Sequence, residues 1–159
     1  MSTYMKISDI PGNVTAKGHE KKIEITKFDF EISRPNHLRV GQTQNRLPGI
    51  PSISTLRITK PLDESTQAFV ERILTGQVID QIEISICRTD KTLMPYVTHT
   101  LKNILVTHYS KSHATGSFPL ENIEFAFTKI QTDYYPTDET GSPAAPNRLA
   151  YDLVNASML

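Results

Sequence analysis

The single cysteine and five histidines are the side chains with which this chain could perform nucleophilic or metal chemistry. Cys87 ends an alternating apolar run, which is typical of a buried structural cysteine, and nucleophilic catalysis would need a base beside it. His108 and His113 stand five residues apart, a spacing that matches no zinc motif. His19 and His99 are interpreted as surface side chains rather than ligands. The sequence therefore predicts no catalytic residue, no metal site and no cofactor.

The sequence also lacks the patterns of acid–base, phosphate-binding and nucleic-acid-binding sites. Asp138 and Glu139 are adjacent carboxylates in a Pro- and Thr-rich stretch, where we expect solvation rather than acid–base tuning. No Gly-rich phosphate-binding loop is present. A single-strand nucleic-acid surface would interleave basic residues with exposed aromatics, whereas the alternating phenylalanines of this chain are interpreted as core residues. These phenylalanines are Phe28, Phe30, Phe125 and Phe127.

Length and composition indicate one folded domain. The chain has 159 residues, and its 17 basic residues balance 17 acidic ones, so no net field favours nucleic acid or anionic lipid. No apolar run of about 18 residues is present, so no membrane insertion is expected. The segment 1–7 lacks a basic stretch followed by an apolar one, and we expect no cleaved signal peptide. With one cysteine, synthesis in a reducing compartment is the default expectation.

Alternating apolar residues dominate the chain and predict a mainly β fold. Short strands are expected at 4–9, 54–59 and 78–87. Three longer candidates each change phase once: 22–32 at Thr26–Lys27, 96–109 at Lys102–Asn103, and 123–134 at Thr128–Lys129. A phase change inside a strand indicates a bulge or sharp bend, which occurs where a sheet curls to close on itself.

One segment has helical rather than strand periodicity. Asp63 or Ser65 can cap it, and Gly76 can end it. The predicted fold is therefore a small closed or tightly coiled antiparallel β-barrel with one short α-helix at about residues 64–75. We expect a single domain over residues 1–159, with a core at about 4–136 and a C-terminal extension at about 137–159.

A long extended loop is predicted at about residues 34–51. It is rich in Pro and Gly, and it is basic and free of acids, whereas the segment 133–159 carries a net charge of −3. Loops of this length usually serve a function in compact domains. We therefore expect the loop to be functional, and its charge would allow it to meet acidic groups of a neighbouring molecule. The candidate interface residues are Arg34, His37, Arg39, Gln42, Gln44, Arg46, Asp138 and Glu139.

Four stretches of the chain, in order, resemble one known family. Tyr4–Gly12 is similar to that family's opening strand and turn, and Gly18–Ile25 to the approach to its second strand. Leu56–Lys60, followed by Asp63–Thr66, resembles its strand, Thr-Lys pair and helix cap. Phe125–Pro136 resembles its last strand and Tyr-x-Pro exit. The family is that of the haemolysin co-regulated proteins (Hcp), which form the inner tube of bacterial type VI secretion systems.

The chain also departs from the family pattern. Phe28–Glu31 stands where the family often has a Trp-x-Trp-Gly-like run, and this chain contains no tryptophan. The loop that follows is rich in Arg, Gln and Pro rather than Gly. An exchange of aromatic for aromatic keeps the strand pattern, and a surface loop tolerates replacement, so the resemblance in fold is unaffected.

The resemblance implies a structural subunit that forms hexameric rings, which stack into a tube. A contractile sheath would expel this tube, and the channel would carry or chaperone small effectors. The implied partners are copies of the chain itself, the spike protein at the tip, and the sheath and baseplate. The implied location is the bacterial cytoplasm during assembly, and then the extracellular space or a target cell.

An alternative interpretation is a small β-barrel binding module for glycan or nucleic acid, without a role in secretion. A glycan module would need a cleft with convergent polar groups, and a nucleic-acid module would bind with strong salt dependence. Only about 23 residues follow Pro136, too few for a second, effector domain. The sequence therefore favours the structural subunit.

Overall fold

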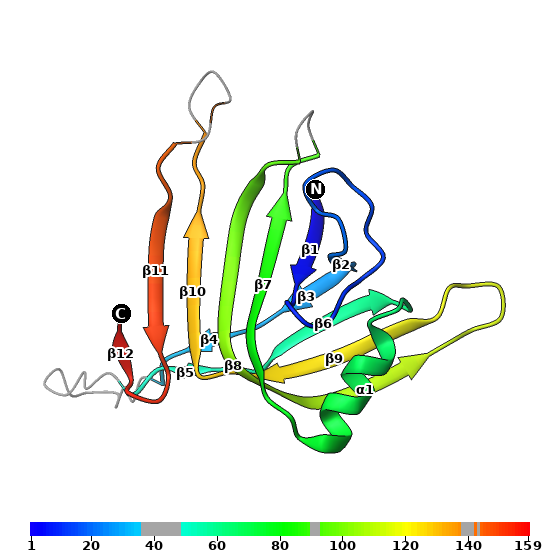
Figure 1. Ribbon diagram of the computed structural model, residues 1–159. Coiled ribbons are helices and arrows are strands. Elements are labelled where there is room, and N and C mark those ends of the chain that lie inside the picture. The colour runs from blue at the N-terminus through cyan, green and yellow to red at the C-terminus, as the bar shows by residue number, and fades with distance from the viewer. Residues whose placement is uncertain (36–48, 90–92, 138–141, 143) are drawn as a thin grey trace, which may run out of the picture.

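The computed structural model describes residues 1–35, 49–89, 93–137, 142 and 144–159. Its described part is mainly β with one helix, as the sequence predicts, and all strand pairs are antiparallel (Figure 1). The elements in chain order are β1 (Ser2–Lys6), β2 (Ile23–Ile25), β3 (Lys27–Asp29), β4 (Ile32–Ser33), β5 (Ser52–Ile53), β6 (Leu56–Pro61), α1 (Thr66–Thr75), β7 (Ile79–Cys87), β8 (Pro95–Ser112), β9 (Leu120–Ala126), β10 (Lys129–Tyr134), β11 (Asn147–Asp152) and β12 (Ser157–Met158).

The long strand β8 belongs to two layers of the sheet. Its first half lies between β7 and β10, in the order β12-β11-β10-β8-β7-β1-β2. Its second half pairs with β9, which continues through β6 to β3. In Figure 1 the first layer stands upright and the second crosses beneath it. The prediction allows a closed barrel or a tightly coiled sheet. The structure is the tightly coiled sheet, because β2 and β3 do not pair with each other in the described part.

The three predicted phase changes are confirmed as the corners between these layers. Thr26 separates β2 from β3, and its N–H donates to the carbonyl of Thr59 at 2.9 Å. Asn103 has a left-handed φ of 54° in the middle of β8. Thr128 lies between β9 and β10, and its N–H donates to Lys102 at 3.2 Å. Each strand therefore turns from one layer to the other where its alternation shifts.

The core fills the space between the layers and the helix. It consists mainly of isoleucines from β2, β6, β7 and β9, with Phe125 of β9 fully buried. Phe69 of α1 is also fully buried, and its ring meets that of Phe125 edge to face at 5.9 Å. Phe127 is buried, and Phe28 and Phe30 pack on the core while half-exposed. The core prediction is thus confirmed for Phe125 and Phe127, whereas Phe28 and Phe30 pack against the core from its edge.

The helix begins two residues later than predicted. Ser65 is its N-terminal cap residue but makes no side-chain capping bond. Instead, the carboxylate of Asp63 accepts the backbone N–H of Ser65 at 2.9 Å. Gly76 ends the helix with a left-handed φ of 69°, and its N–H donates to Arg72. The stop signal at glycine is thus confirmed, because glycine adopts this conformation without a Cβ clash.

The C-terminal extension contains two strands that the sequence analysis did not predict. β11 pairs with β10 along its whole length, and β12 pairs with β11 at Tyr151 and Asp152. The first half of β11 is exposed, so its sequence lacks the alternation of a half-buried strand. The pairing with β10 therefore determines this strand.

Candidate functional site

The described ends of the basic loop lie close together. β4 pairs with β5, and beyond them the N–H of Gly49 donates to the carbonyl of Pro35 at 3.1 Å. A Cβ at Gly49 would approach the ring of Pro35 to 2.6 Å, so this contact requires glycine. Arg34, at the base of the loop, is exposed. The described residues at the two ends of the loop, 34–35 and 49–51, therefore lie next to one another.

Of the predicted interface residues, only Arg34 lies within the described part of the chain. The proposed contact between the basic loop and an acidic group of another copy therefore stays a prediction. The predicted interface residues outside the described part are His37, Arg39, Gln42, Gln44, Arg46, Asp138 and Glu139.

Two other acids of the C-terminal segment are used within the fold. The guanidinium of Arg148 donates to Asp133 at 2.6 Å across β10 and β11, and this bond lowers the pKa of the Asp133 carboxyl. Asp152 accepts the backbone N–H groups of Val154 and Asn155 at 2.9 and 3.1 Å, which lowers the pKa of its carboxyl. Both carboxylates thus fasten β11 and the turn after it.

A buried ionic network joins the helix to the sheet, and the sequence analysis missed it. The ammonium of Lys60 is fully buried and lies 2.6 Å from the carboxylate of Glu121, which is also fully buried, and 2.7 Å from Asp63. Glu121 accepts further bonds from Thr66 at 3.0 Å and from the hydroxyl of Tyr109 at 2.6 Å. Burial and the Glu121 carboxylate raise the pKa of Tyr109 to about 12.

The interpretation of His19 as a surface residue is wrong. Its ring is 6% exposed and stacks on Tyr4 with centroids 4.6 Å apart. Its two nitrogens lie 3.1 Å from the ammonium of Lys22 and from the carbonyl of Leu93. The neighbouring lysines in the sequence suggested exposure, but the segment folds back over the sheet. Cys87 is fully buried, as predicted, and burial raises the pKa of its thiol.

His99 is not a simple surface residue either. It is half-buried in β8 between the edges of Phe28 and Phe30, with ring centroids 5.6 and 5.5 Å away. Its Nδ1 lies 3.0 Å from the hydroxyl of Thr132, and burial lowers the pKa of the imidazole. The core side of β8 thus contains this histidine, because the second layer covers only part of the first.

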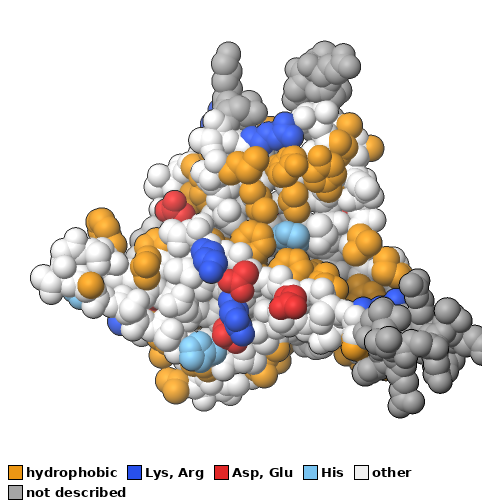
Figure 2. Space-filling model, turned by 180° about the vertical axis from the view of Figure 1, so that it is seen from behind, with side chains coloured by type: hydrophobic (Ala, Val, Ile, Leu, Met, Phe, Trp, Pro, Cys, Tyr) orange, Lys and Arg blue, Asp and Glu red, His pale blue; other side chains and the backbone are white. Residues whose placement is uncertain are grey.

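Apolar and aromatic side chains on this same face remain exposed or half-exposed. Ile86, Val97 and Tyr134 lie directly opposite one another on β7, β8 and β10. The guanidinium of Arg88 lies 4.8 Å above the ring of Tyr96. We call the region formed by Ile86, Tyr96, Val97, Tyr134 and Leu149 the apolar patch. In Figure 2 hydrophobic side chains gather over these strands, above a group of opposed charges.

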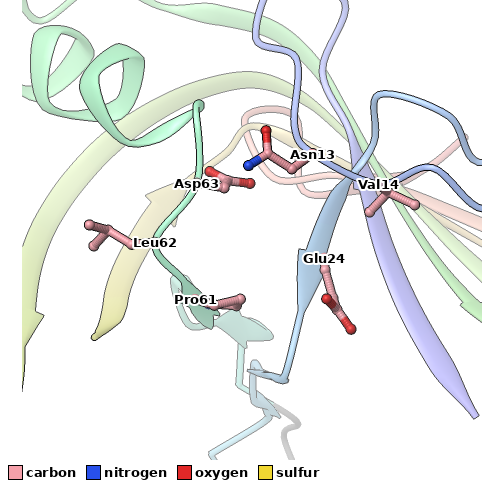
Figure 3. Close-up of a pocket in the computed structure, with 6 residues that line it drawn as sticks. All are labelled: Asn13, Val14, Glu24, Pro61, Leu62 and Asp63. Atoms are coloured by element: carbon pink, nitrogen blue, oxygen red, sulfur yellow. The ribbon is translucent and has the colours of Figure 1, made fainter. Parts of the chain in front are cut away.

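A small cavity of about 220 Å³ separates the N-terminal segment from the connection between β6 and α1. Figure 3 shows the side chains of Asn13 and Asp63 directed toward one another across it, while Leu62 points away. Because the Asp63 carboxylate already binds Lys60 and Ser65, this cavity offers little chemistry to a ligand.

Within the described ranges, no three His, Cys, Asp or Glu side chains gather in a way that could hold a metal ion. No helix in the described part of the chain is long and apolar enough to cross a membrane. The surface features described above are thus the apolar patch and the ends of the basic loop at Pro35 and Gly49.

Comparison with known proteins identifies the family. A family model described as the type VI secretion system effector Hcp matches residues 4–134, so this chain belongs to the Hcp family. A solved type six secretion system protein is 25% identical, with a TM-score of 0.93 and 99% of each chain covered. Hcp1 from Salmonella typhimurium is 17% identical, with a TM-score of 0.80 and coverage of 99% of this chain and 98% of that one. No curated protein matches the chain.

A third structure, a type VI secretion system effector from Yersinia pestis, is 18% identical, with a TM-score of 0.76. It covers 94% of this chain and 98% of its own. Family membership and these structures support a type VI secretion tube protein, which agrees with the resemblance found in the sequence.

Proposed function

We propose that this chain is a non-enzymatic, single-domain subunit of a type VI secretion inner tube, which forms hexameric rings that stack. The observation that carries the proposal is the likeness in fold, at a TM-score of 0.93 over 99% of both chains, to a type six secretion system protein. The tube, with a spike protein at its tip, is expelled by a sheath that contracts on a baseplate, and its channel carries small effectors. The chain leaves the bacterial cytoplasm in this way.

The apolar patch supports the ring contact. Leu149 is 54% exposed and Tyr134 is 38% exposed, next to aromatic side chains of the kind that interfaces concentrate. The patch reaches the edge of the sheet at β11, where residues 147–149 pair with β10 on one side and have no strand partner on the other among the described residues. A neighbouring subunit would cover both the apolar surface and this edge. A head-to-tail ring joins such a patch to a different surface of the next copy.

Charged surfaces suit the contact between stacked rings. On the outer face of β3, β6 and β9, Arg57 lies 2.9 Å from Glu124 and Lys27 lies 3.6 Å from Asp29. The basic loop adds further charge from the base at Arg34 onward. Complementary charges mainly set register and partner choice, and exposed pairs add little affinity. Such weak repeated contacts fit a tube that assembles in one cell and comes apart after delivery.

The first test is the solution mass of the purified protein by light scattering, with negative-stain images of the same sample. A mass of six subunits together with hollow rings is the expected result. A protein that stays monomeric at high concentration would contradict the ring and favour the binding-module alternative.

A charge within the apolar patch tests where the ring contact lies. Leu149→Glu should lower the mass toward that of one subunit, because the contact would bury an unpaired carboxylate. Leu74→Glu, on the exposed surface of α1 at 80% exposure, is the matched control and should leave the mass unchanged. Equal masses for Leu149→Glu and the wild type would place the ring contact elsewhere.

A further inference from the structure

A cavity of about 360 Å³ lies on the opposite, polar face of the first layer, away from the apolar patch. Strands β7 and β8 form its floor, and the segment around His19 and Lys22 forms one wall. Its volume falls within the range of small-molecule sites, about 300–1,000 Å³. Neither the proposed ring contact nor the stacking contact uses this cavity.

Two buried hydroxyls form the floor. Ser85 and Thr98 lie directly opposite each other on β7 and β8, and they are 3% and 8% exposed. Neither hydroxyl has a hydrogen-bond partner among the described residues. In the described part, every side-chain N or O atom that is closed off from solvent has a hydrogen-bond partner. Because the hydroxyls of Ser85 and Thr98 have none, they must be accessible, and they line the cavity. Buried polar groups need partners, and a ligand or water must supply them here.

The wall of the cavity is held in place by His19. An ammonium group can only donate, so Lys22 donates to Nδ1 of His19, and the Nε2–H of the ring donates to the carbonyl of Leu93, each at 3.1 Å. Stacking on Tyr4 fixes the plane of the ring. The site is therefore formed before any ligand arrives, which reduces the entropy cost of binding.

Charges of both signs line the cavity. Lys17 and Lys22 contribute ammonium groups and Glu83 a carboxylate, and none of the three forms an ion pair within the described part of the chain. Glu83 precedes Ser85 by two residues on the same face of β7, so the two anchors stand about 7 Å apart. This separation suits a ligand with an ammonium at one end and a carboxylate close to it.

We propose that this cavity binds a zwitterion of the amino-acid class. The ligand's carboxylate accepts hydrogen bonds from the hydroxyls of Ser85 and Thr98 and from the ammonium of Lys22. The ligand's ammonium donates to Glu83. The ligand is a free amino acid or an N-terminal aspartate of a peptide, whose ammonium and side-chain carboxylate lie close together, and the two share this chemistry.

Equilibrium dialysis of the full-length protein against radiolabelled L-alanine tests the site. The expected result is saturable binding of one alanine per chain. Acetate, which lacks the ammonium, should compete at least about tenfold more weakly, because a hydrogen bond between charged groups is worth a factor of this size. Dialysis against labelled L-aspartyl-L-alanine, whose N-terminal residue carries both charged groups close together, separates a free amino acid from a peptide end.

Matched variants locate the site. Ser85→Ala with Thr98→Val should weaken alanine binding about tenfold or more, since both hydroxyl donors are lost. Thr107→Val with Ser110→Ala, in the half of β8 outside the cavity, should bind as the wild type does. Glu83→Gln should reduce the advantage of alanine over acetate.

Each contrary outcome overturns the proposal. Absence of saturable alanine binding to the wild type would show that no such site exists. Equal binding by the variant Ser85→Ala with Thr98→Val would show that alanine does not bind at these two hydroxyls. Equal competition by acetate would exclude the zwitterion. Light scattering on the same samples reports the ring separately, so loss of alanine binding and failure of ring assembly are distinguishable.

Discussion

At the scale of single residues, substitutions that break a buried ion pair should cost the most stability. Lys60 and Glu121 are both fully buried and compensate each other's charge, and Asp63 is a second carboxylate partner of Lys60. A buried pair is costly to form but much more costly to break, because one charge is then left without a partner. This network lies at the start of α1, so the attachment of the helix to the sheet depends on it.

Lys60→Met should reduce the free energy of unfolding by about 3–5 kcal/mol, because Glu121 would remain buried without a counter-charge. Urea unfolding monitored by circular dichroism measures the loss. Lys27→Met, in an exposed pair, is the control and should change stability by less than about 1 kcal/mol. The double variant Lys60→Met with Glu121→Leu should recover most of the stability. Equal losses from the two lysine substitutions would contradict the network's importance.

The raised pKa of Tyr109, about 12, predicts a loss of stability at high pH. In the unfolded chain a tyrosine titrates near pH 10, so between about 10 and 12 only the unfolded state loses this proton. The contribution of the Tyr109 hydroxyl to the free energy of unfolding is therefore fully present below about pH 10 and declines as the pH rises toward 12. Stability measured across this range should fall less steeply in Tyr109→Phe. Parallel curves for the two proteins would show that Tyr109 is not the group responsible.

At the scale of elements, the corners decide the architecture. Strand β8 continues through a left-handed residue, Asn103, and so belongs to both layers. At the other two corners the strand is interrupted, at Thr26 between β2 and β3 and at Thr128 between β9 and β10. Asparagine tolerates the left-handed region better than other residues with a Cβ do, which explains its place at the only unbroken corner of these three.

Asn103→Val should destabilise the protein by about 1–2 kcal/mol, since a β-branched side chain clashes with the backbone at positive φ. Asn103→Gly should leave stability nearly unchanged, because glycine adopts this conformation freely. Thermal unfolding compares the two variants, with Thr100→Val in the extended part of β8 as the control. If the Val and Gly variants at 103 unfolded at the same temperature, backbone strain would not be the cause.

At the scale of the whole molecule, the two faces of the first layer differ. One carries the apolar patch and faces the second layer, and the other carries the polar cavity. The likeness to a type six secretion system protein extends over 99% of both chains, and so includes β11 and β12. The C-terminal strands are thus part of the common fold, and they bring the edge of the sheet to the apolar patch.

Arg39→Glu combined with Arg46→Glu should weaken the stacking of rings while leaving the domain folded. Charge reversal in an exposed loop changes partner choice more than stability. Sedimentation of assembled polymer measures stacking, and circular dichroism checks the fold. Lys102→Glu with Lys111→Glu alters the charge equally elsewhere and is the control. An unchanged amount of polymer in the loop variant would remove the loop from the stacking contact.

The sequence alone determined the mainly β class, the helix with its glycine stop, the three corners and the resemblance to Hcp. All of these are encoded in local patterns of a few residues. Only the tertiary structure decided that Lys60 meets Glu121, that His19 is buried and that β11 joins the sheet. The physical reason is that alternation reports which side of one strand is apolar, whereas burial and partners depend on strands that pair from distant parts of the chain.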